Sequence, residues 1–220
     1  TGIIQRFDKK NVIIDLGKTE VILPLSEQIP SEEYVQGNRI KVYILEVKKT
    51  TKGPQITVSR SHPGLVKRLF ELEVPEIYDG LVEIKGISRE AGSRTKIAVY
   101  SKNENIDPVG ACVGPKGSRV QSIVDELHGE KIDIIKWDKD ADEFISNALS
   151  PAKVLNVTLE ENTKIARVTV SENQLSLAIG KEGQNARLAA RLTGWKIDIK
   201  SQEQDNFDVN DNARGDESAT

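Results

Sequence analysis

Val113-Gly114-Pro115-Lys116-Gly117-Ser118-Arg119-Val120 is followed 66 residues later by a similar stretch, Ile179-Gly180-Lys181-Glu182-Gly183-Gln184-Asn185-Ala186. In both stretches, two glycines separated by two residues lie between apolar segments. The similarity continues downstream, where the tetrapeptide Lys-Ile-Asp-Ile occurs at 131–134 and again at 196–199. A single Gly-x-x-Gly is common by chance, but two copies with matched flanks indicate an internal repeat of one supersecondary unit.

Each repeat is predicted to contain a helix, a glycine loop, a second helix and a strand. Apolar residues recur at helical spacing after each loop, and the Lys-Ile-Asp-Ile segments alternate as strands do. Gly129 and Gly194 stand where a helix C-terminus favours a left-handed residue. The loop glycines leave no side chain to hold another chain off the backbone. The helix that begins at the loop directs its free N–H groups and its positive dipole end outward, which suits a phosphate.

Upstream of each loop, the pattern adds one helix and two strands. The first repeat is expected to begin with a helix near His62, and Asp107-Pro108 is a favourable start for the helix that leads into its loop. The paired strands are expected at 80–88, 95–100, 154–159 and 165–170. The order α-β-β-α-α-β with a GXXG loop is that of the KH domain, in which the loop clamps about four single-stranded nucleotides. A helix–turn–helix corner would explain one copy, but two matched copies favour the KH interpretation.

The first 60 residues have the pattern of a small all-β domain. Strands are predicted at 2–7, 12–16, 20–25, 39–47 and 55–60, with a short helical stretch at 26–36. Short strands at this spacing indicate an OB barrel, which binds oligonucleotides on one face through aromatic and basic side chains. Candidates for that face are Arg6, Phe7, Lys41, Tyr43 and Arg60. The alternative is that the aromatic residues are core or turn anchors and the charges are solvated.

Composition sets limits on the class of protein. Hydrophobic residues make up 37% and charged residues 30% of the 220, as in soluble proteins with modest cores. No apolar run approaches the roughly 20 residues of a membrane span, and there is no signal-peptide pattern. The single cysteine excludes an internal disulfide framework and suits a reducing compartment, so we expect a cytoplasmic protein.

The net charge of −3 is unevenly distributed. It is +3 over residues 1–61, −1 over 62–136, 0 over 137–200 and −5 over 201–220. This distribution permits RNA binding, which we expect to be of moderate affinity and dependent on salt. The acidic final segment has one aromatic residue and is predicted to be disordered.

The sequence contains no clear motif for nucleotide binding, metal binding or catalysis. The glycines match neither a P-loop nor a dinucleotide-binding fingerprint. Two histidines and one cysteine do not make a usual zinc site, so we expect no metal and no cofactor. Cys112 and His128 lack a third, orienting group, and Cys112 stands where a small buried residue is expected, so we predict no catalytic residues.

The predicted RNA contacts are centred on the two loops. Lys116 is the strongest candidate for reaching a phosphate, and we assign Lys181 the same role in the second loop, although Glu182 places a negative charge beside it. Each of these side chains has the alternative interpretation of a solvated surface residue. The full set of predicted contacts is Gly114, Pro115, Lys116, Gly117, Ser118, Arg119, Gly180, Lys181, Gly183, Gln184, Asn185, Arg187, Arg6 and Phe7.

Several further runs closely resemble the NusA family of bacterial transcription factors. They are 59–61, 87–98, 111–121, 129–135, 147–152, 177–180 and 183–189. The resemblance implies an OB barrel followed by two type II KH domains, in a family whose order begins with a polymerase-binding domain. We therefore expect the chain to be the RNA-binding portion of a longer protein, with a truncated first strand. Glu182 departs from the more basic residues expected in the second loop, so we do not expect a strong phosphate contact there.

The expected domains are an OB barrel at 1–61, a first KH domain at 62–136, a second at 137–200 and the acidic tail at 201–220. The resemblance implies binding of nascent single-stranded RNA and of RNA polymerase, the latter mainly through the missing domain. The implied effects are on elongation, pausing, termination and antitermination. Other antitermination factors are possible partners, and we expect a monomer that contacts no membrane. Two alternatives remain open: a protein-docking scaffold, and the KH and OB module of an RNA-degrading phosphorolytic enzyme.

Overall fold

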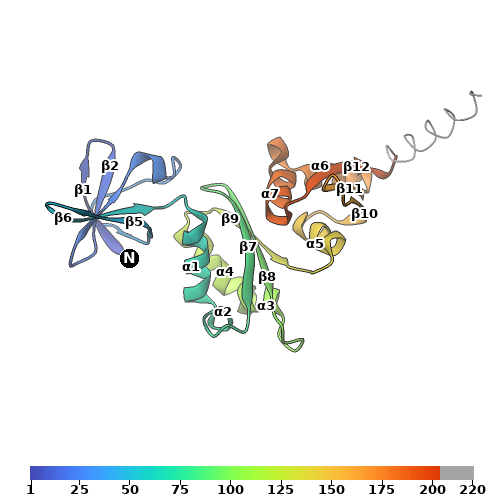
Figure 1. Ribbon diagram of the computed structural model, residues 1–220, viewed down its shortest axis with the longest axis horizontal. Helices are drawn as coiled ribbons and strands as arrows, with labels where there is room; N and C mark the ends of the chain where they lie inside the picture. Colours follow the sequence, from blue (N-terminus) through green and yellow to red (C-terminus); the bar gives the residue numbers. More distant parts are fainter. Residues whose placement is uncertain (204–220) are drawn as a thin grey trace, which may run out of the picture. The chain divides into compact units, whose positions relative to one another are not determined.

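A computed structural model describes residues 1–203 of the 220 (Figure 1). It divides into two compact units. The first contains Thr1–Val82, Arg89–Thr95 and Asn103–Ile132, and the second contains Glu83–Ser88, Lys96–Lys102 and the chain from Asp133 onward. Most of the predicted acidic tail, residues 204–220, lies outside the described residues. Within residues 1–203, no helix is long and apolar enough to cross a membrane.

The first unit begins with a small all-β barrel, as predicted. Its strands are β1 (Gly2–Asp8), β2 (Asn11–Asp15), β3 (Glu20–Leu23), β4 (Arg39–Ile40), β5 (Tyr43–Thr50) and β6 (Gly53–Ser59). They form one sheet in the order β4-β1-β2-β3-β6-β5. Alternate residues such as Ile4, Ile14, Val21, Leu23 and Val58 fill the core, because successive side chains of a strand point to opposite faces.

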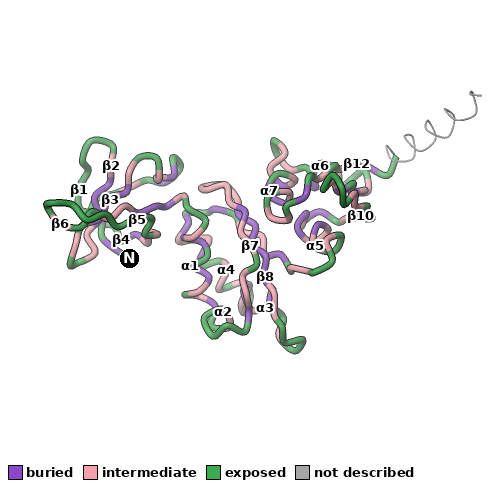
Figure 2. The backbone as a smooth tube through the Cα atoms, in the orientation of Figure 1, coloured by how far each residue is buried: buried purple, intermediate pink, exposed green. Residues whose placement is uncertain are grey.

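Two details of the barrel differ from the sequence prediction. The strand expected at 39–47 is divided into β4 and β5, and β5 continues to Thr50 as an almost fully exposed edge strand (Figure 2). The helical stretch expected at 26–36 is a single 3₁₀ turn, Leu25–Glu27. The turn ends at Gln28, whose backbone is extended with φ −80° and ψ 154°.

Four helices complete the first unit: α1 (Pro63–Glu73), α2 (Pro75–Tyr78), α3 (Pro108–Val113) and α4 (Ser118–Glu126). The His62 ring caps α1, where its Nδ1 accepts a hydrogen bond from the Gly64 N–H at 2.9 Å. Asp107 caps α3 by accepting from the Val109 N–H at 3.1 Å, so the predicted start at Asp107-Pro108 is confirmed. Leu65, Leu69 and Phe70 are the buried face of α1, which packs against α4.

Arg60 ties the barrel to α4 inside the first unit. Its side chain is fully buried, and all five of its N–H donors have an acceptor. Glu32 receives two of these bonds, and the Lys41 carbonyl oxygen receives a third at 2.8 Å. The remaining two reach Glu126, the last residue of α4: one goes to its carboxylate at 3.2 Å and one to its carbonyl oxygen at 2.9 Å. Burial alone lowers the pKa of Arg60, but the hydrogen bonds and charge of Glu32 together with the charge of Glu126 and an effect of Tyr34 raise it, so the net pKa is raised.

A three-stranded sheet completes the first repeat. It consists of β7 (Glu83–Glu90), β8 (Arg94–Tyr100) and β9 (Lys131–Lys136), in that order. The repeat therefore has the predicted order α-β-β-α-α-β, with the additional short helix α2. Glu130, which immediately precedes β9, is buried and accepts two bonds from Arg89 at 2.8 Å and one from the Thr95 hydroxyl at 2.7 Å.

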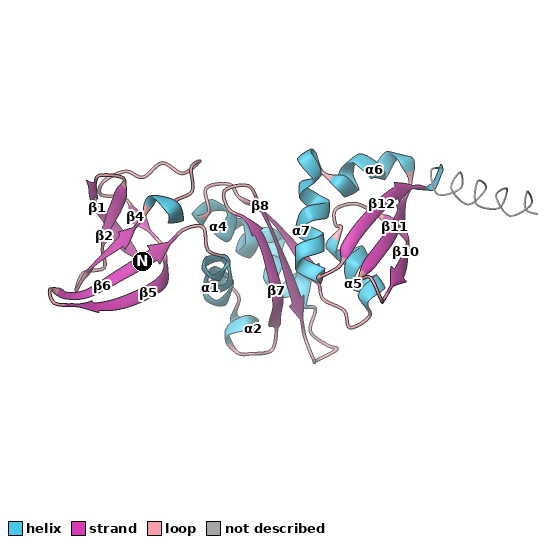
Figure 3. Cartoon of the chain, turned by 45° about the horizontal axis from the view of Figure 1, so that its top comes forward, coloured by secondary structure: helices cyan, strands magenta, loops and turns pink. Residues whose placement is uncertain are grey.

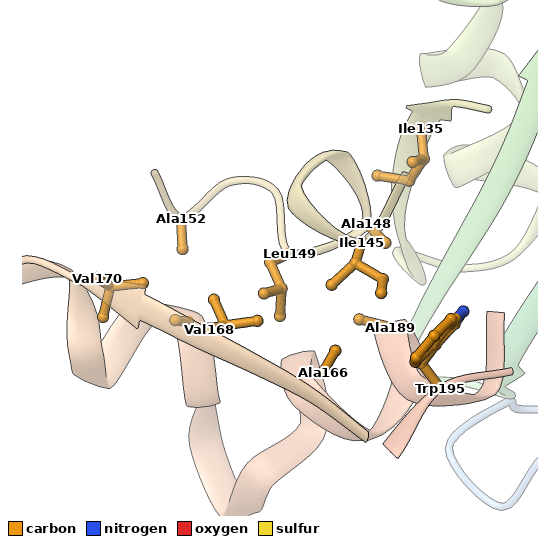
Figure 4. Packing of buried hydrophobic residues seen from close by; sticks show 11 residues of the cluster. Ile135, Ile145, Ala148, Leu149, Ala152, Ala166, Val168, Val170, Ala189 and Trp195 are labelled. Atoms are coloured by element: carbon orange, nitrogen blue, oxygen red, sulfur yellow. The ribbon is translucent and has the colours of Figure 1, made fainter. Parts of the chain in front are cut away.

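The second unit contains the second repeat, which has the same order of elements (Figure 3). They are α5 (Ala141–Ala148), β10 (Val154–Glu160), β11 (Ile165–Val170), α6 (Glu172–Ile179), α7 (Gln184–Thr193) and β12 (Lys196–Ser201). β10 pairs with β11 antiparallel, and β11 pairs with β12 parallel. Ile145, Leu149, Val168, Ala189 and Trp195 lie in the core of this unit (Figure 4).

Buried Lys96 links β8 to β9 and to the turn between α5 and β10, all within the second unit. Its ammonium donates to the Asp133 carboxylate at 3.0 Å and to the Ser150 carbonyl oxygen at 2.7 Å. The predicted combination of a small barrel and two α+β KH-like repeats is therefore the observed fold class.

Candidate nucleic-acid interface

The two glycine loops have the same backbone conformation. Gly114 has φ 76° and ψ 174°, and Gly180 has φ 79° and ψ 169°. The second glycines, Gly117 and Gly183, are left-handed with φ 76° and 74°. In each loop the N–H of the second glycine donates to the carbonyl oxygen of the first at 3.1 Å. The repeat seen in the sequence is therefore also a repeat of backbone geometry.

The first glycine of each loop is required by crowding as well as by backbone angle. A Cβ on Gly114 would lie 2.5 Å from Arg119 Cγ, and one on Gly180 would lie 2.7 Å from the Asn185 backbone nitrogen. Contacts this short do not occur between real Cβ atoms, so the helix after the loop packs directly onto glycine. The first glycine is thus a packing position inside the loop.

The second glycine of each loop faces open space. A Cβ on Gly117 would meet no atom within 4 Å, and one on Gly183 would meet only Arg187 Nη1, at 4.0 Å. The next residues begin α4 and α7, and neither helix has a side-chain cap among the described residues. Helix N-termini without such caps offer N–H donors and a positive dipole end to an anion. This side of each loop is therefore open to the backbone of another chain.

The residues between the glycines differ in charge at equivalent positions. Lys116 and Glu182 occupy the same place, because they have φ of 53° and 54° and both are exposed. Lys181 therefore corresponds to Pro115. The residue equivalent to Lys116 is thus the acidic Glu182, and the phosphate contact predicted for Lys181 would come from the neighbouring position.

Two predicted contact residues are used within the protein to support the loops. Arg119 donates to the Ala111 carbonyl oxygen at 2.7 Å and pairs with the Glu76 carboxylate at 2.9 Å. Asn185 is buried, and its amide donates to the Ala178 and Leu149 carbonyl oxygens, both at 3.0 Å. Arg119 and Asn185 follow their loops at the same interval, and each joins the helix before the loop to the helix after it.

The other predicted loop residues lie nearer the surface. Pro115, Ser118 and Lys181 are exposed, and Gln184 is half-buried in the first turn of α7. Arg187 is exposed and donates to the Glu182 carbonyl oxygen at 3.0 Å, so its cation lies beside the second loop. These side chains are placed where a bound strand could reach them.

The barrel candidates separate into exposed and internal residues. Phe7 is 51% exposed near the end of β1, and neighbouring Arg6 forms a two-point ion pair with Glu20 at 2.6 and 2.8 Å. That hydrogen bond raises the pKa of Arg6. Tyr43 instead stacks on the His62 ring at 4.7 Å, and Arg60 is buried in the junction described above. Phe7 is thus the candidate that the structure leaves available for stacking on a base.

Cys112 lies in the turn of α3 before the first loop and is fully buried, as predicted. Burial raises the pKa of its thiol to about 12, so the group remains protonated at neutral pH. A nucleophilic cysteine needs a lowered pKa and access to solvent. Within residues 1–203 there is also no group of His, Cys, Asp and Glu side chains arranged to hold a metal ion.

Family models match the chain in three consecutive segments. The S1 RNA binding domain matches residues 1–59, the NusA-like first KH domain residues 60–137, and the NusA-like second KH domain residues 141–207. The chain belongs to the NusA family. It is 65% identical over 204 residues to the transcription termination/antitermination protein NusA of Halalkalibacterium halodurans, and 64% identical over 202 residues to that of Bacillus subtilis.

These alignments cover 93% and 92% of the chain but only 53% and 54% of the two relatives. NusA of Thermus thermophilus is 53% identical over 209 residues, with 94% of the chain and 54% of the relative covered. The chain therefore spans about half the length of the curated NusA proteins that it matches.

Proposed function

We propose that the chain binds single-stranded RNA, with each glycine loop holding the phosphate backbone. One observation carries this proposal: the two loops share one backbone conformation, in which an open left-handed glycine stands at the uncapped N-terminus of a helix. Backbone N–H groups at such a site can bind phosphate without reading sequence. Lys116 adds a cation beside the first loop, and Phe7 on the barrel adds a surface on which a base can stack.

The relatives' name supports a role in transcription for the RNA-binding portion. We infer that the chain holds nascent RNA as part of a factor that modulates pausing, termination and antitermination. Contact with RNA polymerase is assigned mainly to the part of the protein that precedes this chain in the family, and other antitermination factors are further candidate partners. The binding step makes and breaks no covalent bond, so we propose that the protein has no catalytic residues and needs no metal or cofactor. We also propose that it is cytoplasmic and monomeric.

We keep the predicted division into a barrel at 1–61, KH domains at 62–136 and 137–200, and a tail. Each KH domain presents one loop, and the proposed contact set is led by Gly117, Gly183 and Lys116. We propose that Arg119 and Asn185 support RNA binding indirectly, by holding their loops in place. Their side chains are already hydrogen-bonded within the protein.

The test is the affinity of a single-stranded RNA of about a dozen nucleotides for Gly117→Asp, Gly183→Asp and the double variant. Aspartate tolerates left-handed backbone better than most residues, and the open space at both positions accepts its side chain. We expect folded variants with weakened binding, and the weakest binding in the double variant. Ser26→Asp, in the 3₁₀ turn of the barrel, adds the same charge and is the matched control. Unchanged affinity in the double variant would refute the clamps and favour a protein-docking scaffold.

A further inference from the structure

The two loops have opposite charges at one geometrically equivalent position. Lys116 and Glu182 both have left-handed backbone, with φ, ψ of 53°, 28° and 54°, 27°. Each is followed by the open glycine and the uncapped helix. The two side chains therefore leave the backbone in the same direction relative to their loops. A phosphate held at the helix N-terminus would have an ammonium nearby in the first loop and a carboxylate nearby in the second.

The neighbouring charges do not remove this difference. In the first loop the Arg119 guanidinium is bonded to Glu76 and to the Ala111 carbonyl oxygen, so Lys116 supplies the exposed cation. In the second loop Lys181 and Arg187 are both exposed cations, with Arg187 Nη1 at 3.0 Å from the Glu182 carbonyl oxygen, and the Glu182 carboxylate offsets one of these two charges. The two loops therefore differ in the sign of the charge at the residue that directly precedes the open glycine.

The walls beside the loops differ as well. The helix before the second loop, α6, exposes Leu177 and Ile179, at 43% and 38%, on different sides of the helix because they are two residues apart. The equivalent residues of α3 are Ala111 and Val113, which are smaller and half-buried. The second loop therefore has more exposed apolar surface beside it, of the kind that packs against bases and sugars rather than phosphates.

We infer that the first loop is the primary phosphate site, and that Glu182 keeps the second loop a weak phosphate site that holds RNA chiefly through exposed apolar side chains of α6. This inference rests on the proposed RNA-binding function and adds a rank order to its two sites. In the first loop, neutralising a phosphate with Lys116 releases counterions and makes binding depend on salt. In the second loop, contact with Leu177 and Ile179 depends little on salt.

The sharpest test exchanges the two residues in the double variant Lys116→Glu, Glu182→Lys. Both side chains already occupy this backbone conformation in the native chain, so the exchange adds no strain, and composition and net charge stay the same. The probe is a tetranucleotide RNA, which matches about one KH groove. Binding is followed through the backbone amide NMR signals of Gly117 and Gly183, with core amides of Ile14 and Val168 as reporters of folding.

In the native protein we expect the Gly117 signal to saturate at a tetranucleotide concentration about tenfold lower than the Gly183 signal. In the exchanged protein the order is expected to reverse, with Gly183 saturating first. An unchanged order, or equal saturation of both loops in the native protein, would overturn the inference while leaving the RNA-binding function in place. If neither amide responds in either protein, the RNA-binding function fails, and the inference fails with it.

Salt dependence gives a second readout on the single variants. For the dozen-nucleotide RNA, Lys116→Gln is expected to reduce the slope of log affinity against log salt concentration. The expected reduction is the amount that corresponds to the loss of one phosphate contact. Leu177→Ser is expected to lower affinity several-fold and leave that slope unchanged. Equal slopes for Lys116→Gln and the native protein would contradict the assignment of the first loop as the phosphate site.

Discussion

Replacing Arg60 with lysine keeps the buried positive charge but removes the planar fork that joins the barrel to α4. The guanidinium gives five hydrogen bonds, to Glu32, the Lys41 carbonyl oxygen and both the carboxylate and the carbonyl oxygen of Glu126. A lysine ammonium has three donors on a single atom, so at least two acceptors lose their partner. The Glu32 side chain is 1% exposed, so water cannot replace the lost bonds there.

Hydrogen bonds to charged groups contribute about 1.5 to 3 kcal/mol each, and breaking a buried ion pair costs about 3 to 5 kcal/mol. Loss of two such bonds with the charge retained therefore predicts that Arg60→Lys lowers the unfolding free energy of the first unit by about 3 to 5 kcal/mol. The assay is urea unfolding followed by circular dichroism, with hydrogen exchange of amides in β2 and α4 to assign the change to the first unit.

The matched control is Arg6→Lys, which makes the same substitution in the exposed pair with Glu20. That pair is solvated and screened, so we expect no clear change in the unfolding midpoint. If Arg60→Lys differs from the native protein by less than about 0.5 kcal/mol, the size of an ordinary surface change, the assigned role of Arg60 is refuted. Equal losses in the two variants would refute it as well.

Three further outcomes follow from the loops and from Cys112. Gly114→Ala should lower the unfolding free energy by about 2 to 4 kcal/mol, because the cost of the left-handed backbone and the cost of overpacking against Arg119 add together. Gly117→Ala should lower it by about 1 to 2 kcal/mol, because only the backbone cost applies there. Thermal unfolding compares the two, and equal losses would contradict the packing role of the first glycine. Iodoacetamide at pH 8.5 should modify native Cys112 slowly and the urea-unfolded chain rapidly; fast labelling of the native protein would show that the thiol is accessible. The Cys112 thiol pKa is raised from 9.0 to about 12 on folding, so its contribution to stability is complete below pH 9 and is lost as pH rises towards 12. Unfolding measured across that range should show a smaller alkaline loss in Cys112→Ala than in the native protein, and identical losses would refute the linkage.

Local sequence patterns were sufficient to predict most of the architecture. The spacing of apolar residues and the positions of Gly129 and Gly194 predict the helix and strand order of both repeats, because periodicity and helix termination are local properties. Both glycines are left-handed in the structure, as predicted. The start of α3 at Asp107-Pro108 and the burial of Cys112 depend on the same kind of local information.

The roles of individual polar side chains could not be predicted in this way, because they depend on partners that are distant in sequence. Arg60 was a candidate for the RNA-binding face of the barrel. Its side chain is instead buried and bonded to Glu126, which is 66 residues away in sequence. Asn185 looked like a surface residue at the start of a helix, but the Leu149 carbonyl oxygen, 36 residues away, accepts from its amide. Both side chains have polar groups that must be satisfied when buried, and only the tertiary structure shows by which partner.

The charge difference between the loops was present in the sequence, where the glycine spacing places Lys116 and Glu182 at the same position. Matching lysine with lysine by residue type equated Lys116 with Lys181, whereas the backbone angles equate Lys116 with Glu182. The backbone angles therefore agree with the glycine spacing rather than with residue type.

We propose above that both glycine loops hold single-stranded RNA. The most direct measurement is photocrosslinking of a dozen-nucleotide RNA that contains 4-thiouridine, with the crosslinked peptides identified by mass spectrometry. We expect crosslinks in peptides that span 113–119 and 180–187, and their loss in the Gly117→Asp, Gly183→Asp double variant. Crosslinks confined to the barrel around Phe7, with neither loop labelled, would contradict it.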